Sequence, residues 1–148
     1  MDETILWKIR AFIYQHFAET TRPPSVVETA SHFALTDEEA GAAYEELHQR
    51  HALFLKPGTH EIFMANPFSG VETQFKVRAD GKTYFANCAW DSLGIPAALH
   101  TDAAIEAACA QSGEPICLSV SGEQVRGSNV LVHFLIPFRE WYNDLTST

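Results

Sequence analysis

The sequence predicts an α+β fold in which a helical N-terminal part precedes a strand-rich part. Apolar residues recur at helical spacing near the N-terminus, whereas short alternating or β-branched segments separated by turn signals dominate later. With 148 residues, the chain is long enough to bury an apolar core. We place the boundary in a polar connection without periodicity. This predicts an N-terminal domain, residues 1–66, and a small mixed α/β domain, residues 67–148.

Three helices and a β-hairpin are expected in the N-terminal domain. The side chains of Ser25 and Thr36 can each cap the start of a helix, and the expected helices cover residues 4–18, 25–33 and 36–51. Two short apolar strands around the Pro57-Gly58 turn follow them. Three helices followed by a hairpin is the order found in winged-helix domains, which are related to the helix-turn-helix proteins.

Charge argues against a nucleic-acid or membrane-surface partner. The formal net charge is -9, whereas contact with phosphate backbones or anionic lipid requires Lys and Arg. The third helix, which would have to meet DNA, carries five acidic residues: Asp37, Glu38, Glu39, Glu45 and Glu46. We therefore interpret the winged-helix-like domain as a structural module.

The expected location is the cytoplasm. No apolar run approaches the length needed to span a bilayer, and the first residues lack the charge pattern and cleavage site of a signal peptide. The three cysteines are an odd number, and a reducing compartment keeps them as thiols: Cys88, Cys109 and Cys117.

The C-terminal domain is expected to contain β-hairpins and short helices. Asp80-Gly81 is a strong hairpin signal between two alternating segments. β-branched content and length predict two further strands, and the last segment predicts a short helix: residues 115–122, 129–137 and 138–145. Residues 101–113 are ambiguous, since their alanine content favours a helix and their Ser-Gly turn favours a hairpin arm.

The segment "NCAWD", residues 87–91, places a thiol and a carboxyl on one face of a helical turn. A helix capped by Asn87 would put Cys88 in its first turn, where free N–H groups and the helix dipole favour a thiolate. Asp91, three residues later, projects from the same face. The pair suits nucleophilic catalysis, or soft-metal binding followed by proton delivery. A buried apolar cysteine beside a helix-stabilising aspartate is the alternative, and spacing alone favours that alternative.

The sequence on both sides of this motif indicates a function more specifically than the spacing of Cys88 and Asp91 does. "TYFANCAWDSLGIPAALH", with "RPPSVVETASHFAL" and "HEIFMANPFSGVETQFKVRADGKTYFANC" before it, resembles the alkylmercury lyase (organomercurial lyase) family. The similarity continues through "CAQSGEPICLSVSG" and "VLVHFLIPFREWYNDL". It implies a winged-helix-like N-terminal domain, an α/β catalytic domain, and cleavage of carbon–mercury bonds by protonolysis.

The resemblance implies roles for the residues of the C-x-x-D motif. Cys88 would bind mercury and Asp91 would assist proton delivery, while Trp90 could shape an apolar pocket for the organic group. The implied substrate is a small organomercurial, and mercury is substrate and product. No cofactor is implied, but external thiols are expected to support turnover.

The resemblance implies that the family's second mercury-binding cysteine follows the segment similar to residues 132–145, and this sequence ends at Thr148. We therefore expect a short form that lacks the family's C-terminal part. The sequence is a piece of a longer protein, or it is a short homologue that recruits Cys109, Cys117 or an external thiol. In a third interpretation it has lost the lyase chemistry and is a non-catalytic binder of soft metals or thiophilic ligands. Strand edges exposed by a missing C-terminal part would favour a homo-oligomer.

Overall fold

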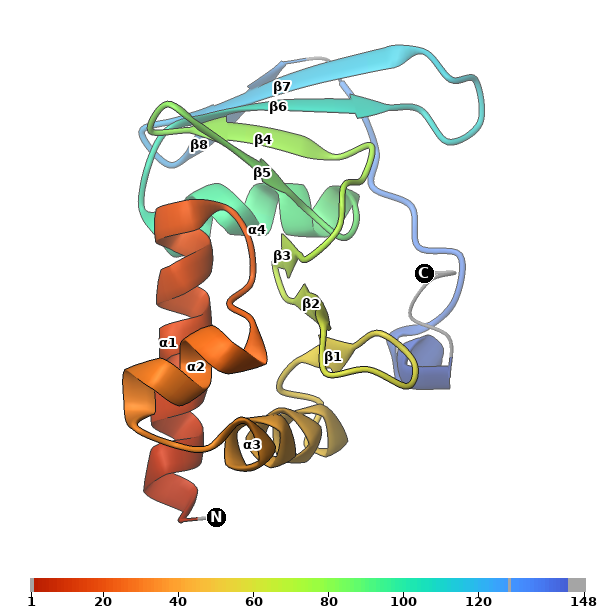
Figure 1. Ribbon diagram of the computed structural model, residues 1–148. Coiled ribbons are helices and arrows are strands. Elements are labelled where there is room, and N and C mark those ends of the chain that lie inside the picture. The colour runs from red at the N-terminus through yellow and green to blue at the C-terminus, as the bar shows by residue number, and fades with distance from the viewer. Residues whose placement is uncertain (1, 128, 144–148) are drawn as a thin grey trace.

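The computed structural model describes residues 2–127 and 129–143 and has the expected mixture of helices and strands (Figure 1). Three helices come first: α1 (Glu3–Thr20), α2 (Val26–Phe33) and α3 (Asp37–Gln49). A small antiparallel sheet of order β1-β2-β3 and a larger antiparallel sheet of order β5-β4-β6-β7-β8 follow. The α+β class predicted from the sequence is confirmed.

The N-terminal helices begin where the sequence places their caps. Ser25 and Thr36 each accept a hydrogen bond from the backbone N–H three residues later, and the glutamates there, Glu28 and Glu39, bond back to the cap N–H. These reciprocal capping boxes satisfy donors that a helix start otherwise leaves free. The first helix buries one apolar stripe against the core: Leu6, Ile9, Ile13 and Phe17.

The small sheet leads the chain from the helices to the larger sheet. It consists of β1 (Phe54–Leu55), β2 (Ile62–Ala65) and β3 (Phe68–Ser69). The predicted hairpin around Pro57-Gly58 is confirmed, because β1 and β2 pair antiparallel on either side of it. A single bridge from Phe68 to Ala86 then links β3 to the strand-rich part.

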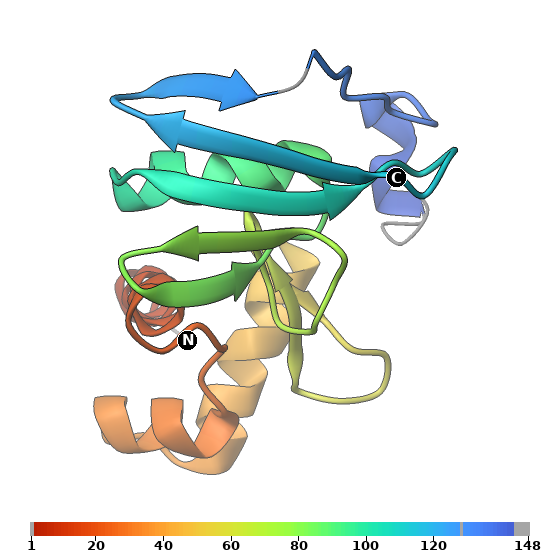
Figure 2. The same cartoon turned by 90° about the horizontal axis from the view of Figure 1, so that it is seen from above.

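The larger sheet has one covered face and one open face. Its strands are β4 (Lys76–Ala79), β5 (Lys82–Phe85), β6 (Ala103–Ala108), β7 (Pro115–Ser121) and β8 (Gln124–Gly127). The helix α4 (Ala89–Leu99) lies under the sheet on the side of the N-terminal helices, as Figures 1 and 2 show. Val77 and Ile105, paired on neighbouring strands, point to that side and are buried. Alternation therefore places Lys76 and Glu106 on the other face.

One cluster of buried side chains runs through both parts of the chain. It joins Ile9 and Phe17 of α1 to Phe68, Val77 and Ile95. The expected boundary at residues 66 and 67 falls between β2 and β3, which pair in the same small sheet. The division into two domains stays a prediction, and separate expression of residues 67–148 would test it.

Two expectations for the C-terminal domain are resolved and one is wrong. Residues 103–108 form a hairpin arm, not a helix, because β6 pairs along β4 and β7. Residues 138–143 form the expected short helix, of the 3-10 type, and the rest of that prediction lies outside the described residues. Residues 129–137, predicted as a strand, have no strand structure. The side chain of Leu131 is 94% exposed there, and no described strand pairs with the segment.

Residues 129–143 leave the sheet and return toward the small sheet (Figure 1). The ring of Tyr142 stacks on that of His51, with 4.2 Å between the ring centroids, and lies 6.0 Å from Phe54 of β1. Within the described residues, no helix has the combination of length and apolar character needed to cross a membrane.

Candidate active site at the start of α4

Cys88 is the N-cap of α4. Its backbone is extended, and its sulfur accepts a hydrogen bond from the backbone N–H of Asp91 at 3.5 Å. The expectation that Asn87 caps this helix, with Cys88 in the first turn, is therefore wrong by one residue. The physical reason is that the side chain of Asn87 is engaged elsewhere, as described below. Cys88 is only partly buried, so its thiol is not sealed from solvent.

Asp91 lies in the first turn of α4, where the helix dipole favours a negative charge. Its carboxylate Oδ2 accepts a hydrogen bond from Nδ2 of Asn87 at 3.0 Å. Asp91 lies three positions after Cys88, and the cap geometry brings them to the same helix start, as the sequence predicts. A thiol and a carboxyl thus lie together at the edge of the core.

Burial raises the pKa values of both groups. Desolvation is the main cause of the raised pKa of the Cys88 thiol; the charge of Asp91 adds to it, and the N–H of Asp91 opposes it. Desolvation likewise raises the pKa of Asp91, while bonds from Asn87 and from the Cys88 thiol oppose the rise. The surroundings therefore favour a protonated thiol at rest beside a carboxyl that can accept a proton.

Trp90 projects outward from the same helix turn. Its side chain is 59% exposed, and its ring meets Phe134 edge-to-face at a centroid separation of 6.3 Å. An apolar hollow of about 490 Å³ lies in the segment next to it, lined by Phe134, Leu135, Ile136, Pro137, Phe138 and Trp141. The expectation that Trp90 shapes a pocket for an organic group stays a prediction, and this hollow is the apolar space that Trp90 adjoins.

The other two cysteines have different positions. Cys109 directly follows the last residue of β6. At this end of the larger sheet, Lys76 of β4 pairs with Phe85 of β5 and with Glu106 of β6. Cys88 comes three residues after Phe85, so Cys88 and Cys109 both follow strands that end on this side of the sheet. Hydrogen bonds from Ser112 lower the pKa of Cys109. Cys117 pairs with Glu106 on the sheet face away from α4 and is exposed.

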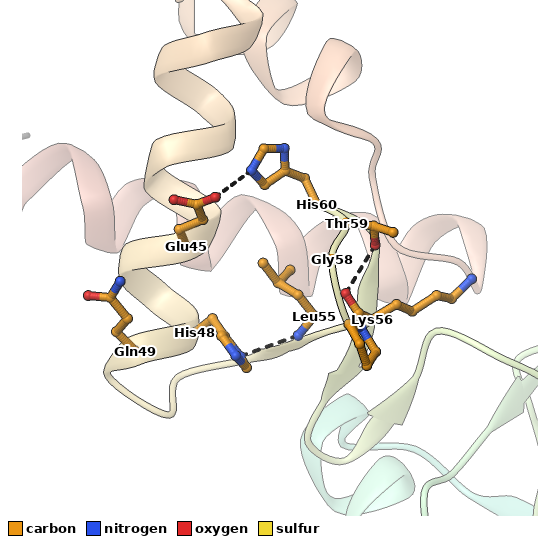
Figure 3. Close-up of a pocket in the computed structure, with 9 residues that line it drawn as sticks. Glu45, His48, Gln49, Leu55, Lys56, Gly58, Thr59 and His60 are labelled. Atoms are coloured by element: carbon orange, nitrogen blue, oxygen red, sulfur yellow. Dashed lines mark hydrogen bonds and ion pairs between the residues drawn. The ribbon is translucent and has the colours of Figure 1, made fainter.

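A second hollow lies far from this helix start. It has a volume of about 460 Å³ and is formed between α3 and the β1–β2 hairpin (Figure 3). Its residues include a pair between Nε2 of His60 and Oε1 of Glu45 at 2.8 Å. Nowhere in residues 2–127 and 129–143 do three or more His, Cys, Asp or Glu side chains form a group able to hold a metal ion.

The partners of the Asn87 side chain could not be predicted from the sequence. Its Nδ2 reaches oxygens of Asn66, Pro67 and Phe68 as well as Asp91. The sequence shows a polar residue, Asn87, directly before the C-x-x-D motif, but its partners in the loop lie about twenty residues earlier in the chain. No local pattern connects the two segments.

The sequence that forms this fold and this helix start matches the model of a known enzyme family. The family model "MerB: Alkylmercury lyase" matches residues 68–148, more than half of the chain. The protein belongs to the alkylmercury lyase family, which confirms the resemblance seen in the sequence.

A solved structure supports the fold assignment. The protein in "Crystal structure of the mercury-bound form of MerB2" is similar over 86% of this chain and 68% of that chain, with a TM-score of 0.62. The two sequences are 20% identical, so the similarity establishes the fold alone. Comparison with curated proteins found no match.

Proposed function

We propose that this protein cleaves the carbon–mercury bond of organomercurials by protonolysis. The observation that carries the proposal is the juxtaposition of a half-buried thiol, Cys88, with a half-buried carboxyl, Asp91, at one helix start in a chain of this family. Soft thiolates are the protein ligands that suit a soft metal such as mercury. A carboxyl beside the ligand can carry the proton that the reaction needs.

The proposed reaction moves one proton through Asp91. The sulfur of Cys88 bonds to mercury in place of the anion or thiolate that accompanies the organomercury cation, which leaves, and the thiol gives up its proton to the carboxylate of Asp91. The protonated carboxyl then donates that proton to the mercury-bound carbon. The carbon–mercury bond breaks and the hydrocarbon leaves. Mercury(II) stays on the sulfur of Cys88, with the regenerated carboxylate of Asp91 or an external thiolate as its second ligand. Because burial raises the pKa of Asp91, this carboxyl accepts and holds the proton more readily than an exposed one would.

A second thiolate would assist cleavage by donating electron density toward the leaving carbon. Among the described cysteines, Cys109 suits this role better than Cys117, because it belongs to the same sheet end as Cys88 and has a lowered pKa. An external thiol can serve in its place and would also remove the bound mercury(II). We therefore propose that turnover requires excess small-molecule thiol and no further cofactor.

The remaining assignments follow the same proposal. The winged-helix-like N-terminal unit is a structural module: the first turn of α3 carries only acidic charge, from Asp37, Glu38 and Glu39, which disfavours DNA. A cytoplasmic location fits a reaction that consumes thiols. Self-association through the outer edge of β8 remains a proposal, and sedimentation would test it.

The test is anaerobic incubation of reduced protein with phenylmercury and excess thiol, with benzene release as the readout. We expect turnover by the wild type, and its loss in both Cys88→Ser and Asp91→Ala. Cys117→Ser is the matched control, since that thiol is exposed on the opposite sheet face and should be dispensable. Cys109→Ser separates an internal second thiol from an external one.

Two results would contradict the proposed reaction. Stoichiometric mercury binding through Cys88 without benzene release would favour the alternative, a non-catalytic binder of soft metals. Benzene release that survives Cys88→Ser would show that the thiol at the start of α4 is not the ligand.

A further inference from the structure

We propose that Asn87 is a positioning residue that holds the carboxyl of Asp91 in place and ties it to the loop formed by residues 66–68. This inference rests on the proposed function, in which Asp91 carries the proton. It adds a residue to the cysteine–aspartate pair. It also includes in the site the loop of residues 66–68, which precedes the larger sheet in the chain.

The contacts of one nitrogen atom carry the inference. Nδ2 of Asn87 lies 3.0 Å from Oδ2 of Asp91, its shortest contact. The same nitrogen lies 3.2 Å from Oδ1 of Asn66, 3.4 Å from the carbonyl of Pro67 and 3.2 Å from the carbonyl of Phe68. The loop oxygens thus fix where the nitrogen sits, and the nitrogen fixes where the carboxyl sits.

The chemistry of these neighbours defines the orientation of the amide. All four are oxygen atoms that accept hydrogen bonds, so the NH₂ group must face them and the carbonyl oxygen must face away. That oxygen, Oδ1 of Asn87, is buried and has no hydrogen-bond partner among the described residues. The amide therefore serves here as a donor, and an acceptor at this place would be repelled.

The anchor itself is held from several sides. Phe68 is 2% exposed and stacks on Phe17 of α1 with 5.2 Å between ring centroids. The hydroxyl of Tyr14 donates to the carbonyl of Asn66 at 3.0 Å. A Cβ atom added to Gly94 of α4 would lie 3.0 Å from Cβ of Pro67, so the helix packs closely on the loop. A rigid anchor is what a positioning contact needs.

The bond to Oδ2 suits a carboxyl that gains and loses a proton. As a carboxylate, Asp91 accepts the amide N–H through Oδ2. When the proton resides on Oδ1, Oδ2 becomes the carbonyl oxygen and still accepts the same bond. Asn87 can therefore hold Asp91 in both states and leave Oδ1 for proton exchange with the thiol and the substrate carbon.

Steady-state kinetics on full-length variants tests this role. Asn87→Ala removes the donor, and we expect kcat to fall about 10- to 100-fold with KM changed less than about threefold, because Asn87 orients the acid without binding substrate. Asn87→Asp keeps the shape but places a carboxylate among four oxygens, so its kcat should be lower still. A residue that only fills space would give the opposite order. Asn87→Leu replaces Asn87→Asp if the latter does not fold, and should behave like Asn87→Ala.

Asn66→Ala is the matched control. It removes one of the three loop acceptors and leaves the bond to Asp91, so kcat should fall less than in Asn87→Ala. Circular dichroism and thermal unfolding establish that each variant is folded. An Asn87→Asp variant that is folded and more active than Asn87→Ala would overturn the proposal, and so would an unchanged kcat in Asn87→Ala.

An NMR measurement separates this inference from the lyase function. The side-chain NH₂ signals of Asn87 should exchange slowly with water and should shift when Asp91→Ala removes the acceptor. This outcome would support the positioning role even if the wild type released no benzene, a result that would count against the proposed function alone. Signals that stay in place in Asp91→Ala would overturn the inference, whatever the activity.

Discussion

At the scale of single residues, Cys88 caps a helix, and the chemical role that we propose for it places a different demand on the same side chain. As the N-cap it accepts a hydrogen bond from the N–H of Asp91, but at 3.5 Å sulfur is a weak acceptor. Serine is among the best N-cap residues, because its oxygen accepts such a bond well. A cysteine at this position therefore sacrifices capping strength, which is consistent with a chemical role for the thiol.

This comparison makes a prediction about stability. Cys88→Ser should leave the free energy of unfolding unchanged or raise it, while Cys88→Ala should lower it by about 0.5–1 kcal/mol through loss of the cap. Urea unfolding followed by circular dichroism measures both. If Cys88→Ser were instead the less stable variant, the sulfur would matter for packing, and its use as an inactive control would be compromised.

At the scale of elements, charged caps tie the N-terminal helices to the connections between them. The carboxylate of Glu28 accepts the N–H of Ser25 at 2.8 Å and pairs with both Nη atoms of Arg22. The bond from Arg22 is the largest cause that holds the pKa of Glu28 well below its ordinary value of 4.5, and the N–H of Ser25 adds to it. The start of α2 is thereby linked to the loop that leaves α1.

The lowered pKa predicts how this contribution varies with pH. A carboxyl whose pKa is lower in the folded state stabilises the fold above its unfolded pKa, and the contribution is lost as pH falls through the folded value. Glu28→Gln should therefore lower the free energy of unfolding by about 0.5–1 kcal/mol at pH 7, since the pair is largely exposed. The difference should shrink steadily below about pH 4.5.

Urea unfolding at pH 7, 4 and 2.5 checks this dependence. Glu72→Gln is the control, since Glu72 is exposed and takes part in no ion pair among the described residues. A difference between Glu28→Gln and wild type that persists unchanged at pH 2.5 would mean that its charge is not what stabilises α2.

At the scale of the whole molecule, aromatic contacts hold the C-terminal segment, residues 129–143, against parts of the fold that are distant in sequence. Tyr142 stacks on His51 after α3, and Phe134 meets Trp90 at the start of α4. The segment nevertheless exposes large apolar side chains, including Leu131, Leu135 and Phe138. Few contacts therefore hold an apolar segment that passes beside the candidate site.

We predict that these few contacts control how accessible the segment is. Tyr142→Ala removes the stack on His51, so trypsin should cleave after Arg126 or Arg139 several-fold faster while the rest of the fold stays intact. Timed digestion with mass spectrometry measures the rates. Leu131→Ala is the control, because it also removes a large apolar side chain from this segment, but one that is 94% exposed. Equal rates in Tyr142→Ala and wild type would show that the stack does not hold the segment.

The sequence by itself determined the features that depend on neighbours a few residues apart. The caps at Ser25 and Thr36, the turn at Asp80-Gly81 and the shared helix start of Cys88 and Asp91 are all local, and all are present. Helix caps and two-residue turns are formed by adjacent residues, so their chemistry can be read directly from the chain. The family was likewise visible in the wording around Cys88.

Only the tertiary structure decided the features that need a partner from elsewhere in the chain. Residues 129–137 have the composition of a strand, but a strand forms only where another strand pairs with it, and none of the described strands does. Asn87 looked like a helix cap, yet its amide is drawn to oxygens about twenty residues earlier and to Asp91, which leaves the cap to Cys88. Hydrogen bonds and strand pairing between distant segments depend on how the whole chain packs, so they cannot be predicted from neighbouring residues in the sequence.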